Sequence, residues 1–136
     1  MKDERGSMTL WAFGLSLLLF GVGFLALDLW NAFSARSEAA GVADSAAIAG
    51  ATALDETAWR SGVLALDPTA AHDRASSAAL SHPAWDPSMG LSVSATAEGV
   101  SVTVTRSIPF RFVNALVPGR VATVSVTGFA EPGEGP

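Results

Sequence analysis

Residues 6–27 read GSMTLWAFGLSLLLFGVGFLAL, a run of 22 residues without a charged side chain. As an α-helix the run would be about 33 Å long, close to the roughly 30 Å hydrocarbon core of a bilayer. It therefore predicts a membrane-spanning helix over residues 7–27. A cleaved signal peptide is the alternative, because Lys2 and Arg5 precede the run. The apolar region of a signal is usually only about 7 to 15 residues long, which favours the membrane span.

The charges that flank the span predict its orientation. Lys2 and Arg5 lie before it, and Arg36 is the first cation after it. Because cytoplasmic flanks carry the excess of Lys and Arg, we expect the N-terminus to be cytoplasmic. The rest of the chain would then lie outside, in a single-pass protein of the cytoplasmic membrane.

The composition excludes several classes of function. The chain has 136 residues, with 8 Lys and Arg against 13 Asp and Glu, and a net charge of -5. Binding to nucleic acid phosphates needs clustered cations, so we expect no nucleic-acid partner. The absence of cysteine removes disulfides, zinc thiolate sites and cysteine nucleophiles. From Asp28 onward 11 acids face 6 arginines, so the span carries a small acidic head.

The helix is expected to continue beyond the membrane, because residues 28–57 lack proline and are rich in alanine. Small residues recur along one face of this extension at alternating spacings of four and three; they are Ala39, Ala43, Ala46, Gly50 and Ala53. Such a face permits the close approach of another backbone, either of a partner subunit or of the protein's own head. Asp28, the acid at the membrane exit, is expected to be a solvated charge or to pair with a partner subunit.

A second helix and three strands are expected after the extension. Asp67-Pro68 is typical of an N-cap followed by proline in the first helical turn, and predicts a helix over residues 68–80 that ends before His82-Pro83. Alternating apolar and polar residues then predict three antiparallel strands; they cover residues 91–97, 100–105 and 121–130, with Glu98-Gly99 as a turn and 108–117 as a short helix or an edge element.

The fold class is therefore α+β, a long N-terminal helix that packs against a small three-stranded antiparallel sheet. The predicted parts are a cytoplasmic N-terminus (1–6), a transmembrane helix (7–27), an extracytoplasmic helix extension (28–57), a small α+β head (58–130) and a flexible tail (131–136).

Residues that could carry chemistry are scattered along the chain. His72 and His82 are ten residues apart, with Asp73 and Asp86 nearby, which does not place metal ligands on one helix face. The serines lack the G-x-S-x-G pattern of a nucleophile elbow. We therefore expect no enzyme activity, no catalytic residues, no cofactor or metal, and no small-molecule substrate.

Three sequence features, taken in order, resemble the TadE/TadG-like proteins of Tad (Flp-type) pilus assembly systems, particularly the short actinobacterial ones. They are DERGSMTL at residues 3–10, LDL at residues 27–29 and ADSAAIAGA at residues 43–51. The resemblance covers roughly residues 3–54. It implies a minor pilin or pseudopilin-like component with a pilin-like fold, inserted in the membrane with its head outside.

The resemblance also implies partners. Other pilus-assembly subunits would pack against the helix, where Gly14 and Gly21 permit close approach within the bilayer. A prepilin peptidase would cut between Gly6 and Ser7. The fifth position after that bond is Trp11, whereas pilins and TadE-like members carry a Glu there, so we expect the bond to stay intact. The alternative function is a membrane-tethered extracytoplasmic binding module unrelated to pili.

Overall fold

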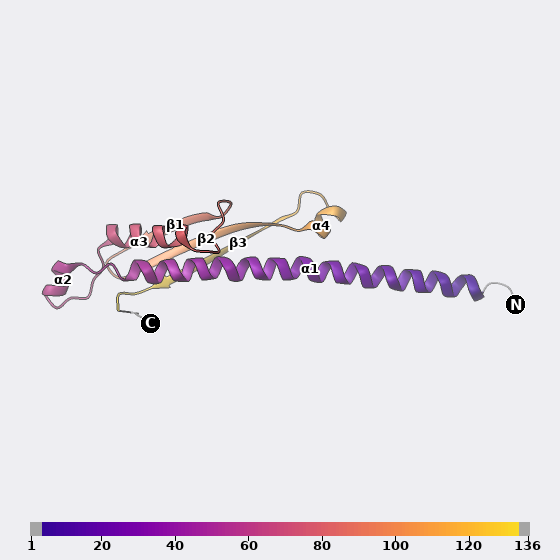
Figure 1. Cartoon of the computed structure of the whole chain (residues 1–136), viewed down its shortest axis with the longest axis horizontal. Coiled ribbons are helices and arrows are strands. Elements are labelled where there is room, and N and C mark those ends of the chain that lie inside the picture. Colours follow the sequence, from indigo (N-terminus) through magenta and orange to yellow (C-terminus); the bar gives the residue numbers. More distant parts are fainter. Residues whose placement is uncertain (1–3, 134–136) are drawn as a thin grey trace.

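The computed structural model describes residues 4–133, and one long helix organises them (Figure 1). This helix, α1 (Glu4–Ala51), has 48 residues, and its C-terminal half carries the head. The elements of the head are α2 (Glu56–Arg60), α3 (Pro68–Ser81), β1 (Gly90–Ala95), β2 (Val100–Pro109), α4 (Arg111–Leu116) and β3 (Val121–Ala130). The predicted α+β class, with a long apolar N-terminal helix and a three-stranded antiparallel sheet, is confirmed.

The sheet is an antiparallel meander in the order β1-β2-β3. The central strand β2 buries its alternate valines, Val100, Val102 and Val104, as the period of two in the sequence predicts. Ala95 pairs with Val100, so the turn before β2 is centred between residues 97 and 98. The predicted Glu98-Gly99 turn is therefore displaced by one residue.

The core of the head is built from small side chains that bring backbones close together. A Cβ at Gly128 on β3 would lie 2.6 Å from the backbone carbonyl carbon and oxygen of Ala43 on α1. A Cβ at Gly50 would lie 3.0 Å from the carbonyl oxygen of Ala71 and from the Cβ of Ala75, both on α3. α1 therefore contacts the sheet and α3 almost at the level of the main chain.

The long helix ends at Ala51, earlier than the predicted limit of residue 57. Long-range backbone pairing explains the difference, because Leu54 forms an isolated antiparallel bridge with Leu66. The N–H of Asp55 donates to the carbonyl of Ala65 at 2.9 Å. Asp55 then caps α2, a short helix that the sequence interpretation missed, by accepting from the N–H of Thr57 at 2.7 Å.

The second predicted helix is confirmed at both ends. The side chain of Asp67 accepts from the backbone N–H groups of Thr69 and Ala70, and the helix stops at Ser81. The connection at residues 108–117, predicted as a short helix or an edge element, contains the short helix α4, while β2 runs on to Pro109. Residues 1–3 of the predicted cytoplasmic segment and 134–136 of the predicted tail lie outside the described residues.

Candidate functional site

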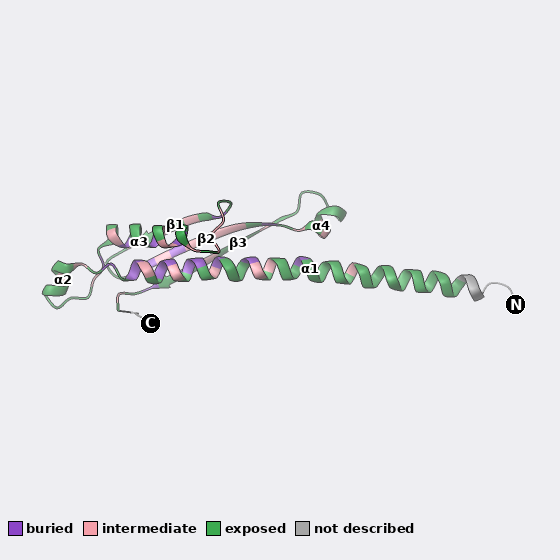
Figure 2. Ribbon diagram, viewed as in Figure 1, coloured by how far each residue is buried: buried purple, intermediate pink, exposed green. Residues whose placement is uncertain are grey.

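Residues 7–27 of α1, called here the bare half, lie outside the core of the head. Every large apolar side chain from Met8 to Leu27 is exposed, whereas the C-terminal half is covered by the head (Figure 2). A contiguous apolar surface of this size marks a membrane or protein contact. By length and composition, α1 is long and apolar enough to cross a membrane.

The two glycines expected to pack against other helices lie on this bare half. A Cβ at Gly14 or Gly21 would meet nothing within 4 Å, so both positions are open to an incoming helix. Their role in packing stays a prediction. Gly6 and Ser7, the bond that a prepilin peptidase would cut, lie at the start of the same helix.

The small-residue face of the helix extension is occupied within the chain. All five of its members are buried in the head: Ala39, Ala43, Ala46, Gly50 and Ala53. Gly50 lies against α3, and Ala43 lies against β3. Of the two interpretations left open by the sequence, packing against the protein's own head is the one observed. The packing of Gly50 against α3 and of Ala43 against β3 leaves no room for a second backbone at these positions.

Asp28 lies where the bare half of α1 meets the covered half. It is only 7% exposed, and its Oδ2 accepts hydrogen bonds from the backbone N–H groups of Phe112 at 3.0 Å and Val113 at 3.2 Å. These groups belong to the first turn of α4, whose own N-cap residue, Phe110, makes no side-chain cap. A carboxylate at a helix N-terminus stabilises the free N–H groups and the helix dipole. Asp28 therefore caps α4 across 84 residues of sequence, rather than remaining solvated or pairing with another subunit.

An aromatic pair fixes α4 next to the bare half of α1. The rings of Phe24 and Phe112 stack with centroids 4.9 Å apart and an angle of 12° between their planes. Phe24 belongs to the uncharged run, so α4 reaches back past Asp28 onto the predicted span. Sequence reasoning missed this contact because the two phenylalanines lie far apart in the sequence.

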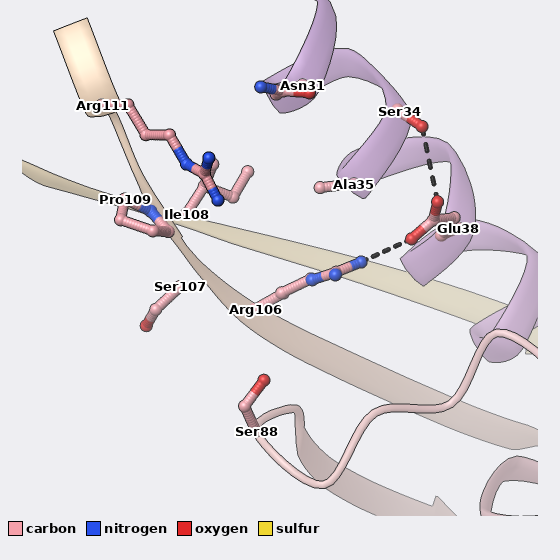
Figure 3. Close-up of a pocket in the computed structure, with 10 residues that line it drawn as sticks. All are labelled: Asn31, Ser34, Ala35, Glu38, Ser88, Arg106, Ser107, Ile108, Pro109 and Arg111. Carbon is pink, nitrogen blue, oxygen red and sulfur yellow. Dashed lines mark hydrogen bonds and ion pairs between the residues drawn. The ribbon is translucent and has the colours of Figure 1, made fainter. Parts of the chain in front are cut away.

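A polar recess of about 510 Å³ lies between α1 and the end of β2, just beyond Asp28 (Figure 3). On one side, Glu38 accepts from the guanidinium of Arg106 at 2.6 Å and from the hydroxyl of Ser34 at 3.4 Å. Arg111 extends from the start of α4 into the recess (Figure 3). The Glu38–Arg106 ion pair links α1 to the sheet and leaves Arg111 as the cation that faces an open space.

The histidines do not form a site. His72 lies 3.5 Å from the carboxylate of its neighbour Asp73, and the Nδ1 of His82 accepts from the N–H of Ala84 at 3.1 Å. Hydrogen bonds from the backbone N–H and hydroxyl of Ser88 lower the pKa of Asp86, and the nearby Arg106 lowers it further. Across residues 7–133, no three His, Cys, Asp or Glu residues are grouped closely enough to hold a metal ion.

The fold defines a protein with one long apolar helix. The N-terminal half of this helix is bare, its C-terminal half carries a small α+β head, and Asp28 lies at the boundary between the two halves. Residues 6–53 match the model of a family described as putative Flp pilus-assembly TadE/G-like, which confirms the resemblance seen in the sequence. The matched segment is almost the whole of α1. No curated protein and no solved structure matches the chain. The family match supports a pilus-related role.

Proposed function

We propose that the chain is a membrane-anchored minor pilin or pseudopilin-like component of a Tad-type (Flp) pilus assembly or related secretion system. The observation that carries this proposal is the family match over residues 6–53, on a helix whose first half is bare. Residues 7–27 cross the cytoplasmic membrane once, residues 1–6 remain in the cytoplasm and the head lies outside. The protein is not an enzyme; its partners are the bilayer and other pilus-assembly subunits.

The arrangement suits a subunit that moves from lipid into a filament. The bare half of α1 exchanges lipid for neighbouring helices, and Gly14 and Gly21 permit the close approach on which such packing depends. Gly128 brings β3 against the main chain of α1, so we expect the head to move together with the helix. A separate cytoplasmic ATPase supplies the energy for this movement into the filament.

Leucine substitutions on the bare half test this role against that of a membrane-tethered binding module. Gly14 and Gly21 are seven residues apart and share nearly one face, whereas Gly23 is rotated by about 200° from Gly21. Each of the three positions has free space around it. We expect Gly14→Leu and Gly21→Leu to reduce pilus assembly or secretion strongly in the organism that encodes the chain, and the matched control Gly23→Leu to reduce it far less.

The comparison is made at equal amounts of membrane-bound protein, measured by immunoblot. If both variants assemble like the unaltered protein, the helix is only a tether and the pilin-like role is wrong. Ala46 does not serve this test, because it is buried in the head and a larger side chain there disturbs folding in either case.

The proposal includes an intact Gly6–Ser7 bond. Trp11 occupies the position where processed pilins carry a glutamate. Intact-mass measurement of the protein from membranes should therefore show that Ser7 is not the first residue. A mature chain that begins at Ser7 would contradict this prediction and identify a prepilin peptidase as a partner.

A further inference from the structure

The α4 tip, defined as residues 110–120, lies at the height where α1 leaves the predicted span. Asp28 holds the first turn of α4 through two hydrogen bonds, and Phe112 stacks on Phe24. Phe24 is one helical turn inside the uncharged run. If residues 7–27 cross the bilayer, as the proposed function holds, this part of the head must meet the outer membrane surface.

The α4 tip exposes apolar side chains that the core does not use. Leu116 is 71% exposed and Val117 is 48% exposed. In the residues of α1 that follow Asp28, Leu29, Trp30 and Phe33 are also exposed. Tryptophan at such a boundary suits the interface between headgroups and acyl chains. Both chain segments thus expose apolar groups beside the contact between α4 and Asp28.

The charge of the α4 tip differs from that of the whole protein. Residues 99–130 contain three arginines and no acid, in a chain whose net charge is -5. Arg106 is paired with Glu38, whereas Arg111 and Arg120 are exposed and have no side-chain hydrogen bond or ion pair within residues 7–133. Arginine guanidinium groups bind phosphate oxygens well, because their planar donor fork matches the phosphate geometry.

The loop that carries these groups is held in shape. The side-chain oxygen of Asn114 accepts from the backbone N–H of Gly119 at 2.7 Å and of Arg120 at 3.3 Å. Gly119 has a φ of 85°, which glycine adopts without strain. Leu116, Val117 and Arg120 therefore lie in or beside a loop with a fixed backbone, so little ordering is left to occur on binding.

We propose that the α4 tip docks on the outer leaflet of the membrane. Leu116 and Val117 enter the interface, and Arg111 and Arg120 bind the phosphates of anionic phospholipids. The occupant is lipid and not another protein, because Asp28 and Phe24 fix the tip on the helix that crosses the bilayer, at the boundary of its uncharged run. This proposal rests on the membrane anchoring of residues 7–27.

Spin labels on single cysteines test the docking, since the chain has no cysteine of its own. The full chain carries a nitroxide at Val117→Cys, at the matched control Val63→Cys, or at Leu18→Cys in the bare half of α1. Val63 is 56% exposed and lies in the loop after α2, at the other end of the head (Figure 1). Relaxation by oxygen and by a water-soluble nickel chelate reports the depth of each label in phosphatidylcholine nanodiscs with and without phosphatidylglycerol.

We expect the label at residue 18 to be relaxed mainly by oxygen, as in lipid. Relative to the water-like label at residue 63, the label at residue 117 should be relaxed more by oxygen and less by the nickel chelate. Phosphatidylglycerol should increase this difference. Replacing both Arg111 and Arg120 with Gln should remove the increase. A water-like label at 117 beside a lipid-exposed label at 18 overturns the docking but leaves the anchor intact. A label at 117 that is shielded from both reagents also overturns it, because it indicates a protein contact. A water-like label at 18 overturns the anchor, and the docking with it.

Discussion

The two halves of α1 are both helical and both rich in apolar residues, yet one is bare and the other is the centre of the core. Residues 7–27 carry mostly leucine, phenylalanine and other large side chains, which stay exposed. Residues 28–51 carry mostly alanine and other small residues on the face that the head covers. Side-chain size and the absence of charge together separate the half that faces its surroundings from the half that contacts the sheet. Asp28 marks the boundary and fixes α4 there.

The largest effect should come from filling the space between α1 and β3. Gly128→Ala places a Cβ 2.6 Å from the Ala43 main chain, so we expect the free energy of unfolding to fall by about 2 to 3 kcal/mol. Thermal unfolding of the full chain in detergent micelles measures this loss. A stability equal to that of the unaltered protein would show that β3 does not contact α1 so closely.

Two controls sharpen the contrast between the halves. Gly41→Ala adds a Cβ on an open face of the covered half, and should raise stability by about 0.5 to 1 kcal/mol because alanine favours the helix. Leu18→Ala removes an exposed side chain from the bare half and should leave the unfolding of the head unchanged.

The next largest loss of stability should come from removing the cap at Asp28, the boundary between the two halves of α1. Asp28→Ala removes the only side-chain cap seen on α4 within the described residues, and should cost about 1 to 2 kcal/mol locally. Amide hydrogen exchange should rise at Phe112 and Val113 while β2 stays protected. Asp28→Asn keeps one carbonyl oxygen as an acceptor, and should restore part of the protection. Unchanged exchange in the Ala variant would show that α4 is held without Asp28.

The ion pair between the covered half of α1 and the sheet should contribute less to the free energy of unfolding. Glu38 and Arg106 lie 2.6 Å apart, but both side chains remain partly exposed, so their coupling should be about 0.5 to 1 kcal/mol. A double-mutant cycle with Glu38→Gln and Arg106→Gln measures it by thermal unfolding. The coupling should shrink as salt is added, and a coupling that does not respond to salt would argue against an electrostatic origin.

The smallest effect involves the loop before β1. Because hydrogen bonds from Ser88 hold the pKa of Asp86 below its ordinary value of 3.8, the ionised form contributes stability above pH 3.8. That contribution is lost as the pH falls from 3.8 through the lower folded-state pKa. The melting temperature of the unaltered protein should therefore approach that of Asp86→Asn on acidification. A difference that stays constant with pH would contradict this linkage.

Local signals in the sequence predicted most of the fold. Asp67-Pro68 fixed the start of α3, and the alternation of valine with serine and threonine predicted the strands. The end of α1 was missed because it depends on pairing between Leu54 and Leu66. The cap on α4 was missed for the same reason, since its acid lies 84 residues away in sequence. The small-residue face left two interpretations open because spacing shows that a backbone approaches closely, without showing which backbone it is.

Cysteine labelling in a bacterial host tests most directly the claim that α1 is an anchor in one half and a core helix in the other. Single variants Lys2→Cys, Leu18→Cys and Val63→Cys are treated with a membrane-impermeant maleimide. We predict that Val63→Cys reacts on cells whose inner membrane is intact, that Lys2→Cys reacts only after lysis, and that Leu18→Cys reacts only after the membrane is dissolved and the chain denatured. Reaction of Leu18→Cys in intact membranes, or equal reaction of Lys2→Cys and Val63→Cys before lysis, would contradict the account.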